Sequence, residues 1–295
     1  VNNNDSNLNF KYNDKNHKIN IYFKNAVLLS KSLKKKNFEF ILLTNNKIYL
    51  DKINNNKFSL NIEQIEFKTV VNIESHFSSC HYRIDLFNYF SKKKHYSALL
   101  DLDVVALGQI SDQVKELIDN KNAVIVNDIS DNVIPAYGIK KIKNNLEIVL
   151  KNKSECKWYG GDLFLGPPEF FKDLFENVKF THENFKKNFN RLKDQTDELF
   201  MSAAIEMVKK KNKFIVLNSR EYGFLDRFWS VNTKHAQDNF SVISKNFLVH
   251  FPADKIFLSE MVTNEFSKEF FLNNYDKYSN SIKKRFTNFL SKILS

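Results

Sequence analysis

The chain has 295 residues, of which 45 are lysine or arginine and 34 are aspartate or glutamate, so its formal net charge is +11. Hydrophobic residues make up 42% of it and aromatic residues 14%, which excludes a disordered chain. Only six residues are glycine, well below the usual share of about 7%. No three glycines fit a dinucleotide-binding fingerprint, and Gly161 and Gly166, which have P-loop spacing, are followed by Pro167 instead of lysine. Both kinds of glycine-rich phosphate loop are therefore excluded.

The composition also indicates in which cellular compartment the protein works and which classes of partner it binds. The two cysteines form no C-x-x-C pair, as expected of ordinary thiols in a reducing compartment. No run approaches about 18 apolar residues, and the polar start is not a signal peptide, so we expect a cytoplasmic protein. The positive charge is almost all lysine, spread along the chain, whereas nucleic-acid-binding proteins favour arginine collected on one face. We therefore expect no nucleic-acid partner, while an anionic membrane surface remains open.

Strands and helices alternate through the first half of the chain, after a polar lead-in at residues 1–17. Apolar runs predict strands at residues 19–23, 38–46, 64–71, 96–100 and 122–130. Between them, apolar residues at three- and four-residue steps predict helices at residues 26–35 and 75–92. This alternation predicts an α/β fold with a mixed but mainly parallel sheet flanked by helices.

The second half begins with a lysine-rich stretch after Pro135. The pattern then predicts helices at about residues 168–191 and 197–210 and late strands within residues 214–224 and 245–251. No internal repeat or low-complexity linker interrupts the chain. We therefore expect a single domain over residues 18–257 and a basic amphipathic helical segment over residues 258–295.

Two aspartates close the predicted strand at residues 96–100. Asp101 and Asp103 are two residues apart, so in an extended chain both carboxylates point to the same side. Ligands of open α/β sheets bind at the carboxyl ends of the strands. Two carboxylates this close repel each other unless they share a cation, and a divalent ion with phosphate oxygens as its other ligands satisfies them. The alternative is a pair of acids in an ordinary turn.

These residues resemble the GT-A class of nucleotide-sugar glycosyltransferases. They are most similar to the retaining families that include glycogenin-like enzymes and bacterial lipopolysaccharide sugar transferases. The matching features are a helix with Arg83, an apolar strand, and the aspartate pair followed by Val-Val-Ala-Leu. The resemblance implies a GT-A fold over residues 18–257. It also implies that Asp101 faces the ribose or the metal, that Asp103 binds the metal, and that Arg83 helps to hold the nucleotide.

Residues 158–166 hold half of the glycines of the chain. This segment resembles the strand and turn that line the sugar and acceptor pocket of such enzymes, where small residues let the backbone approach a ligand closely. The resemblance implies that Gly160, Gly161 and Asp162 bind the nucleotide-sugar. The alternative is a glycine-containing turn before the helix that starts at Pro167 and Pro168.

Three acids surround the start of the helix predicted at residues 197–210. The family places an acidic residue near the reacting anomeric carbon or the acceptor hydroxyl, and the resemblance can be aligned on Asp194 or on Asp197 and Glu198. All three are therefore candidate catalytic residues. The alternative is that acids in a first helical turn only cap the helix and complement its dipole.

The last matching segment follows the predicted strand within residues 245–251. In glycogenin-like families a histidine here is the third metal ligand and a lysine shortly after it contacts the diphosphate, which implies these roles for His250 and Lys255. This sequence lacks the usual glycine between the two and the Pro-Trp after the lysine. Tyr22 and Phe23, in the first predicted strand, lie where such enzymes contact the nucleotide base.

The resemblance implies a Mn²⁺- or Mg²⁺-dependent enzyme that transfers a sugar from a nucleotide, most commonly UDP, to a saccharide or a lipid-linked glycan. The context that it implies is the synthesis of bacterial surface polysaccharide or lipooligosaccharide. The resemblance favours retention of configuration at the anomeric carbon. Two alternatives stay open. One is a phosphotransferase of the haloacid dehalogenase type, although Val104 fits poorly where such enzymes carry Thr or Gly. The other is an inactive carbohydrate-binding protein on the same fold.

The C-terminal tail, residues 279–295, combines an apolar helical stripe with basic residues. Such a helix suits the interface of an anionic membrane, here the inner face of the cell membrane. It suits equally a terminal helix docked on the domain.

Overall fold

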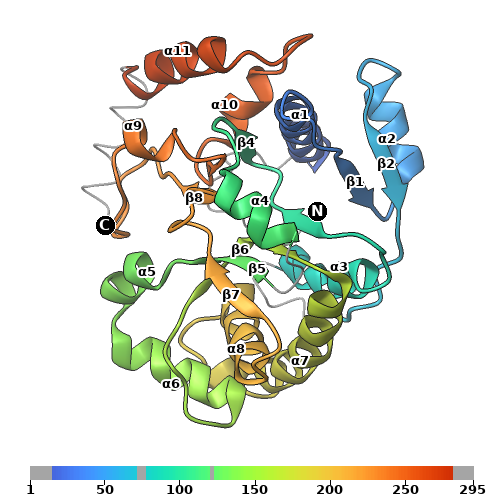
Figure 1. Ribbon diagram of the computed structural model, residues 1–295. Coiled ribbons are helices and arrows are strands. Elements are labelled where there is room, and N and C mark those ends of the chain that lie inside the picture. Colours follow the sequence, from blue (N-terminus) through green and yellow to red (C-terminus); the bar gives the residue numbers. More distant parts are fainter. Residues whose placement is uncertain (1–14, 72–77, 120–122, 282–295) are drawn as a thin grey trace. The chain divides into compact units, whose positions relative to one another are not determined.

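The computed structural model describes residues 15–71, 78–119 and 123–281 (Figure 1). The chain divides into two compact units, each assembled from separate stretches of sequence. Among the described residues, the first unit contains Phe67–Asp101 and Ile110–Leu225, and the second contains residues 15–66, Leu102–Gln109 and residues 226–281. The chain therefore passes from the first unit to the second between Asp101 and Leu102.

The first unit is built on a four-stranded sheet in the order β3-β6-β5-β7. Its strands are β3 (Ser97–Leu100), β5 (Ala123–Asp128), β6 (Tyr159–Gly166) and β7 (Ile215–Asn218). β5 and β7 are parallel, whereas β6 runs antiparallel to both of its neighbours, β3 and β5. Every residue of β6 is buried, as expected of a central strand covered on both faces.

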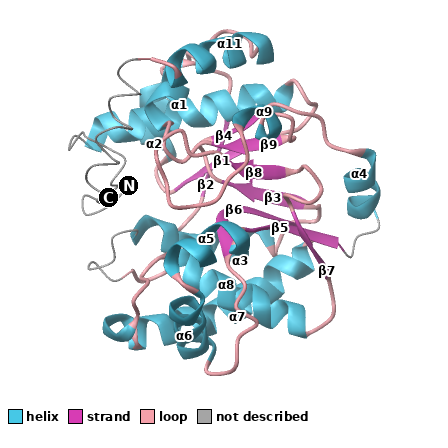
Figure 2. Cartoon of the chain, turned by 90° about the vertical axis from the view of Figure 1, so that its left-hand side faces the viewer, coloured by secondary structure: helices cyan, strands magenta, loops and turns pink. Residues whose placement is uncertain are grey.

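Most helices of this unit lie below its sheet in the view of Figure 2. The helices of the unit are η1 (Ser78–Tyr82), α3 (Arg83–Phe90), α4 (Asp112–Asp119), α5 (Ser130–Tyr137), α6 (Ile139–Leu150), α7 (Pro168–Lys187), η2 (Phe189–Arg191) and α8 (Asp197–Lys210). α7 and α8 pack on each other and on β6. Phe87 of α3, Phe164 of β6 and Phe171 of α7 are fully buried, and the ring of Phe87 packs against the other two. The many phenylalanines of the sequence thus supply core volume.

The second unit contains two smaller sheets. The parallel pair is β1 (Ile41–Thr44) and β2 (Asn61–Gln64). The three-stranded sheet has the order β4-β9-β8, with β4 (Val104–Ala106), β9 (Leu248–His250) and β8 (Leu225–Arg227). Its helices are α1 (Lys15–Lys34), α2 (Lys47–Asn54), α9 (Phe240–Ile243), α10 (Lys255–Glu260) and α11 (Lys268–Ser279).

Helix α1 packs on α10 and on β4, and its apolar residues are almost all buried. Ser32 ties it to the sheet, because its hydroxyl oxygen accepts a hydrogen bond of 3.0 Å from the backbone NH of Ala106. Phe257 of α10 and Phe271 and Tyr275 of α11 lie in one buried cluster of this unit. Helices α10 and α11 are therefore parts of its core. Among the described residues, no helix is long and apolar enough to cross a membrane.

The fold class predicted from the sequence, α/β with helices flanking mixed sheets, is confirmed. The share of antiparallel pairing is larger than expected, because β6 runs against β3 and β5, and β9 runs against β4. The strands and helices predicted in the middle of the chain agree with the structure. β5 lies within residues 122–130, α7 and η2 together span residues 168–191, and α8 spans residues 197–210. The boundary predicted after residue 257 falls inside α10, and the division into 18–257 and 258–295 stays a prediction.

Two predicted strands are wrong. Residues 19–23 belong to helix α1, which also contains the helix predicted at residues 26–35. A short apolar run does not distinguish a strand from a buried helix, and no glycine or proline separates the two stretches. The strand predicted at residues 64–71 ends where it was expected to begin, since β2 covers Asn61–Gln64. Residues 1–14 of the lead-in and 282–295 of the tail lie outside the described residues.

Candidate functional site

Asp101 is held at the carboxyl end of β3. The antiparallel register pairs Leu100 with Leu163, and the backbone NH of Asp101 continues it with a hydrogen bond of 3.2 Å to the carbonyl of Asp162. The apolar strand therefore ends against β6 just where the aspartate begins, as the sequence predicted.

Arg83, the first residue of α3, joins two acids of the first unit. One guanidinium nitrogen donates to Asp101 and the other to Asp197, the first residue of α8. Burial works against the charge of Arg83, but the two carboxylates raise its pKa well above the ordinary value. For Asp197, burial raises the pKa to about 6, helped by Glu198 and Asp101 and opposed by Arg83. The arginine thus holds two acids that are far apart in the sequence.

Glu198 lies beside this group with both carboxylate oxygens hydrogen-bonded. The indole NH of Trp158 donates to Oε2 at 2.9 Å, and the backbone NH of Gly161 donates to Oε1 at 3.3 Å. Gly161 also leaves the space that Arg83 occupies, because a Cβ at this position would lie 2.6 Å from its Nη1 atom. The glycine-containing strand therefore orients an acid and admits an arginine.

Asp162 and Asp194 are placed differently from Glu198. The carboxylate of Asp162 is fully buried and accepts hydrogen bonds of 3.1 and 3.2 Å from the side-chain amide of Asn127. Asp194 accepts from the hydroxyl of Thr196 at 2.7 Å and from its backbone NH at 3.0 Å, and burial raises its pKa. These contacts fit the alternative to catalysis, in which Asp194 only stabilises the turn before α8. Gly160 is a buried residue of β6.

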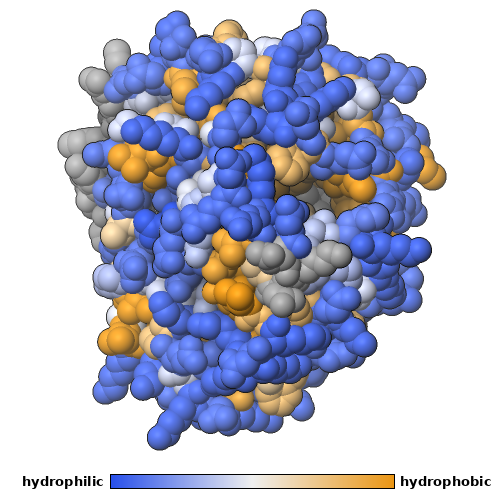
Figure 3. All heavy atoms as spheres, in the orientation of Figure 1, coloured by the Kyte–Doolittle hydropathy of each residue, from blue (hydrophilic) through white to orange (hydrophobic). Residues whose placement is uncertain are grey.

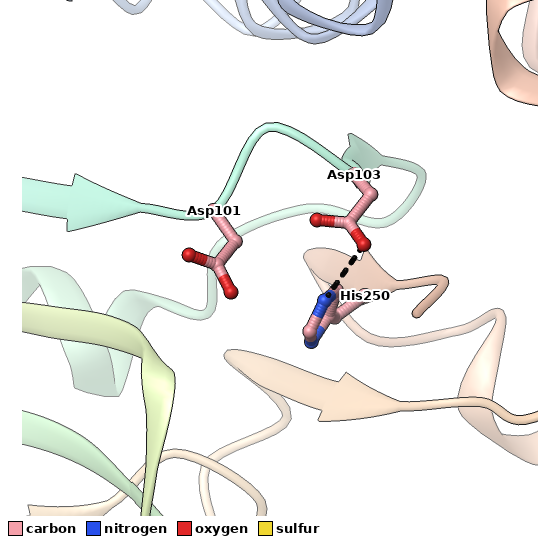
Figure 4. Close-up of side chains that lie close together, drawn as sticks. All are labelled: Asp101, Asp103 and His250. Atoms are coloured by element: carbon pink, nitrogen blue, oxygen red, sulfur yellow. Dashed lines mark ion pairs between the residues drawn. The ribbon is translucent and has the colours of Figure 1, made fainter. Parts of the chain in front are cut away.

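Asp103 is the centre of a charged group in the second unit. It directly precedes β4, where Val104 pairs with His250 of β9 and the backbone NH of Phe251 donates to the Asp103 carbonyl at 2.8 Å. The carboxylate oxygen Oδ2 lies 3.2 Å from Nε2 of His250 (Figure 4). The same oxygen lies 2.5 Å from Nζ of Lys255. Burial opposes ionisation of Asp103, but Lys255 and His250 lower its pKa below the ordinary range.

The side chains predicted as metal ligands can provide a metal site. Asp103 and His250 lie together in the second unit, and Asp101 precedes Asp103 by two residues, so that the three could hold a metal ion. Carboxylate oxygens suit hard divalent ions such as Mn²⁺ and Mg²⁺. The β4–β9 register brings His250 to the aspartate, which the sequence could not show.

Tyr22 and Phe23 do not lie on a first strand, because this part of the chain is α1. Phe23 is only 3% exposed and packs in an apolar cluster with Val27 and Leu42. The reason for assigning both residues to the nucleotide base is therefore lost. Trp158, by contrast, was not assigned a role of its own, although the sequence places it two residues before Gly160.

No family model matches the sequence, and no curated protein matches it significantly. Among solved structures, the chain is similar to mouse xyloside xylosyltransferase 1 in its apo form, with a TM-score of 0.43 and 12% sequence identity over 80% of this chain and 94% of that chain. At this level of similarity, function is inferred from the residues of this chain alone.

Proposed function

We propose that the protein is a GT-A type glycosyltransferase that uses a divalent metal ion and a nucleotide-linked sugar. The observation that carries this proposal is the buried carboxylate of Asp103, held by His250 and Lys255. A carboxylate that is 3% exposed is costly to keep charged unless cations or a metal compensate it. Together with Asp101, this set offers ligands for a cation and an ammonium group for a phosphate.

In this proposal Asp101, Asp103 and His250 hold Mn²⁺ or Mg²⁺, which neutralises negative charge on the departing nucleoside diphosphate. Lys255 supplies a further positive charge for that leaving group, since its ammonium already lies at an anionic oxygen. Arg83 keeps Asp101 oriented at the end of β3. The nucleotide is most simply UDP, as in most similar enzymes, and Gly160, Gly161 and Asp162 line the donor sugar.

Among the three candidate acids, the contacts favour Glu198 as the residue that acts at the anomeric carbon or the acceptor hydroxyl. Asp197 is occupied by Arg83, and Asp194 by the turn at Thr196. Glu198 is oriented by Trp158 and by the backbone NH of Gly161. A carboxylate fixed in this way can stabilise positive charge that develops on the sugar, or accept the proton of the acceptor hydroxyl.

The acceptor in this proposal is a saccharide or a lipid-linked glycan of a surface polysaccharide or lipooligosaccharide. A lipid-linked acceptor would be met at the inner face of the cell membrane, to which residues 279–295 are proposed to bind. The protein is proposed to be cytoplasmic with peripheral membrane contact, and no nucleic acid is involved.

The test is thermal unfolding with UDP-, GDP-, CMP- and TDP-linked sugars, each with Mn²⁺ or with EDTA. A nucleotide-sugar at 100 times its dissociation constant stabilises the folded protein by about 2.7 kcal/mol. We expect one nucleotide to stabilise it only with metal, and Asp103→Asn to remove that shift. Asp112→Asn, a change of an exposed acid on α4, is the matched control.

The same variants separate the alternatives. Metal-dependent cleavage of the nucleotide-sugar that is lost in Asp103→Asn identifies an enzyme, whereas binding without turnover identifies a carbohydrate-binding protein. Phosphate release from a phosphomonoester would identify a phosphotransferase. Metal-dependent stabilisation that survives in Asp103→Asn would exclude the proposed site.

A further inference from the structure

A cavity of about 440 Å³ lies in the first unit, and its lining includes the Asp194–Thr196 turn described above. Tyr137 at the end of α5 and Lys141 in α6 form one wall, and residues 192–196, between η2 and α8, form the other. Its volume lies in the range of small-molecule sites, about 300–1,000 Å³. The second wall ends one residue before Asp197, so the cavity is continuous in sequence with the candidate acids.

The lining of the cavity has more positively than negatively charged side chains. Lys141 and Lys193 contribute two ammonium groups, and Asp194 contributes one carboxylate. Asp194 is already engaged by the hydroxyl and backbone NH of Thr196. Within the described part of the chain, neither lysine lies within ion-pair distance of a carboxylate, and the Lys141 ammonium lies 5.6 Å from the centroid of the Tyr137 ring. The cavity therefore favours an anionic ligand.

Tyr137 gives the cavity an aromatic wall. Its side chain is 46% exposed, which leaves ring surface that a ligand can cover. Burial raises the pKa of its hydroxyl, and the charges of Asp194 and Glu198 raise it further. An exposed aromatic face together with amide and charged side chains suits the apolar face and the hydroxyl groups of a sugar ring.

We propose that this cavity binds a saccharide with an anionic group, a carboxylate or a phosphate, whose ring contacts Tyr137 and whose charge pairs with Lys141 and Lys193. The proposal rests on the proposed function in one respect, namely that the bound saccharide is the acceptor. The lining ends at Thr196, two residues before Glu198 in the chain, so an acceptor bound here would be held by the segment that leads into the acid proposed to handle its hydroxyl. The lysines select among acceptors by charge.

Binding is measured on the full chain by saturation-transfer NMR, with EDTA and without nucleotide. The probes share one ring and differ only at its sixth carbon: methyl β-glucopyranoside, its 6-phosphate, and methyl β-glucuronide. We expect the two anionic probes to bind more tightly than the neutral one. Lys193→Gln should weaken the anionic probes by about fivefold without changing the neutral one, and Tyr137→Ala should weaken all three.

The matched control is Lys143→Gln, which removes an exposed lysine of α6 outside the cavity lining and should change no affinity. Preference for the phosphate or for the glucuronide identifies the source of the charge. Equal binding of the neutral and anionic probes, binding of none, or equal losses in Lys193→Gln and Lys143→Gln would overturn the proposal. These outcomes are independent of the thermal-shift test with nucleotide-sugars, so the two proposals fail separately.

Discussion

Arg83 can lie between Asp101 and Asp197 only because residue 161 has no side chain. A Cβ there would also meet Met201 at 3.1 Å, and this contact is tighter than an unstrained methyl group tolerates. The sequence marked Gly161 as a residue that lets a ligand approach. The structure shows that the group it admits is a guanidinium of the protein itself.

We expect Gly161→Ala to displace Arg83 from its carboxylates and to lower the free energy of unfolding by about 1–3 kcal/mol. Metal-dependent nucleotide binding should weaken as well, because Asp101 loses its partner. A double-mutant cycle with Arg83→Ala, read by chemical denaturation, checks the cause. If the two changes were simply additive, the methyl group would not act through Arg83.

Asp197 predicts a pH dependence of stability. Its pKa in the folded protein is about 6, against an ordinary value of 3.8, so the folded state binds more protons than the unfolded state between about pH 4 and pH 6. Stability from this group is therefore present at low pH and is lost as the pH rises through 6. We expect Asp197→Asn to remove this loss, which is at most about 3 kcal/mol.

This pH-dependent loss of stability is measured by denaturation curves at intervals from pH 4 to pH 8. The control is Asp131→Asn, which changes an exposed acid in the first turn of α5. If the free energy of unfolding changed equally with pH in the wild-type protein and in the Asp197→Asn variant, Asp197 would not be the group that binds the extra proton. Asp103 acts in the opposite direction: its depressed pKa contributes stability that is lost only as the pH falls below about 4.

At the scale of elements, α11 anchors the segment that carries Lys255. Asp254 is fully buried and accepts hydrogen bonds from Ser230 at 2.5 Å, from the hydroxyl of Tyr275 at 2.9 Å and from that of Tyr278 at 3.0 Å. Both tyrosines belong to α11. A buried carboxylate therefore connects this helix to the start of α10, one residue before the lysine proposed to contact the diphosphate.

Tyr275→Phe removes one of these donors without changing the volume of the core. We expect a loss of about 1.5–3 kcal/mol in the free energy of unfolding, since the hydrogen bond goes to a charged group. Tyr49→Phe removes an exposed hydroxyl that binds Asn16 and should cost less than about 0.5 kcal/mol. Equal, small losses in both variants would mean that Asp254 does not depend on α11.

The elements themselves show where sequence reasoning succeeds and where it fails. Strand β5 and helices α7 and α8 were predicted because their apolar periodicity is long and bounded by turn residues. Helix α1 was divided into a strand and a helix, since nearly all of its apolar face and flanks are buried and the period is blurred. Helix α6 was missed because its lysines dominate the local composition.

At the scale of the molecule, the net charge of +11 is expected to favour anionic surfaces. Figure 3 shows a mainly hydrophilic face with small, separate apolar patches. The sequence of the tail, residues 279–295, differs from this hydrophilic surface, because it combines basic residues with apolar residues at helical spacing. Membrane binding, where it occurs, is expected to depend on this segment.

We expect the full chain to co-sediment with anionic phosphatidylserine vesicles and not with neutral phosphatidylcholine vesicles. Replacing Lys283, Lys284 and Arg285 together by glutamine should lower the partition coefficient about 100-fold, because each basic residue contributes about 1 kcal/mol. Replacing three exposed lysines outside the cavity lining, Lys140, Lys143 and Lys153, by glutamine is the charge-matched control. Equal losses in both variants would assign the effect to net charge and not to the tail.

The sequence by itself determined the α/β class, the middle strands and helices, and the placement of Asp101 and Asp103 after an apolar strand, because these depend on local periodicity. Only the tertiary structure decided that β6 runs against its neighbours, that residues 19–23 are helical, and that His250 and Lys255 reach Asp103. It likewise decided that Arg83 binds Asp197, a residue 114 positions away. Such pairings depend on which distant surfaces bury each other, and a local pattern of residues carries no record of that choice.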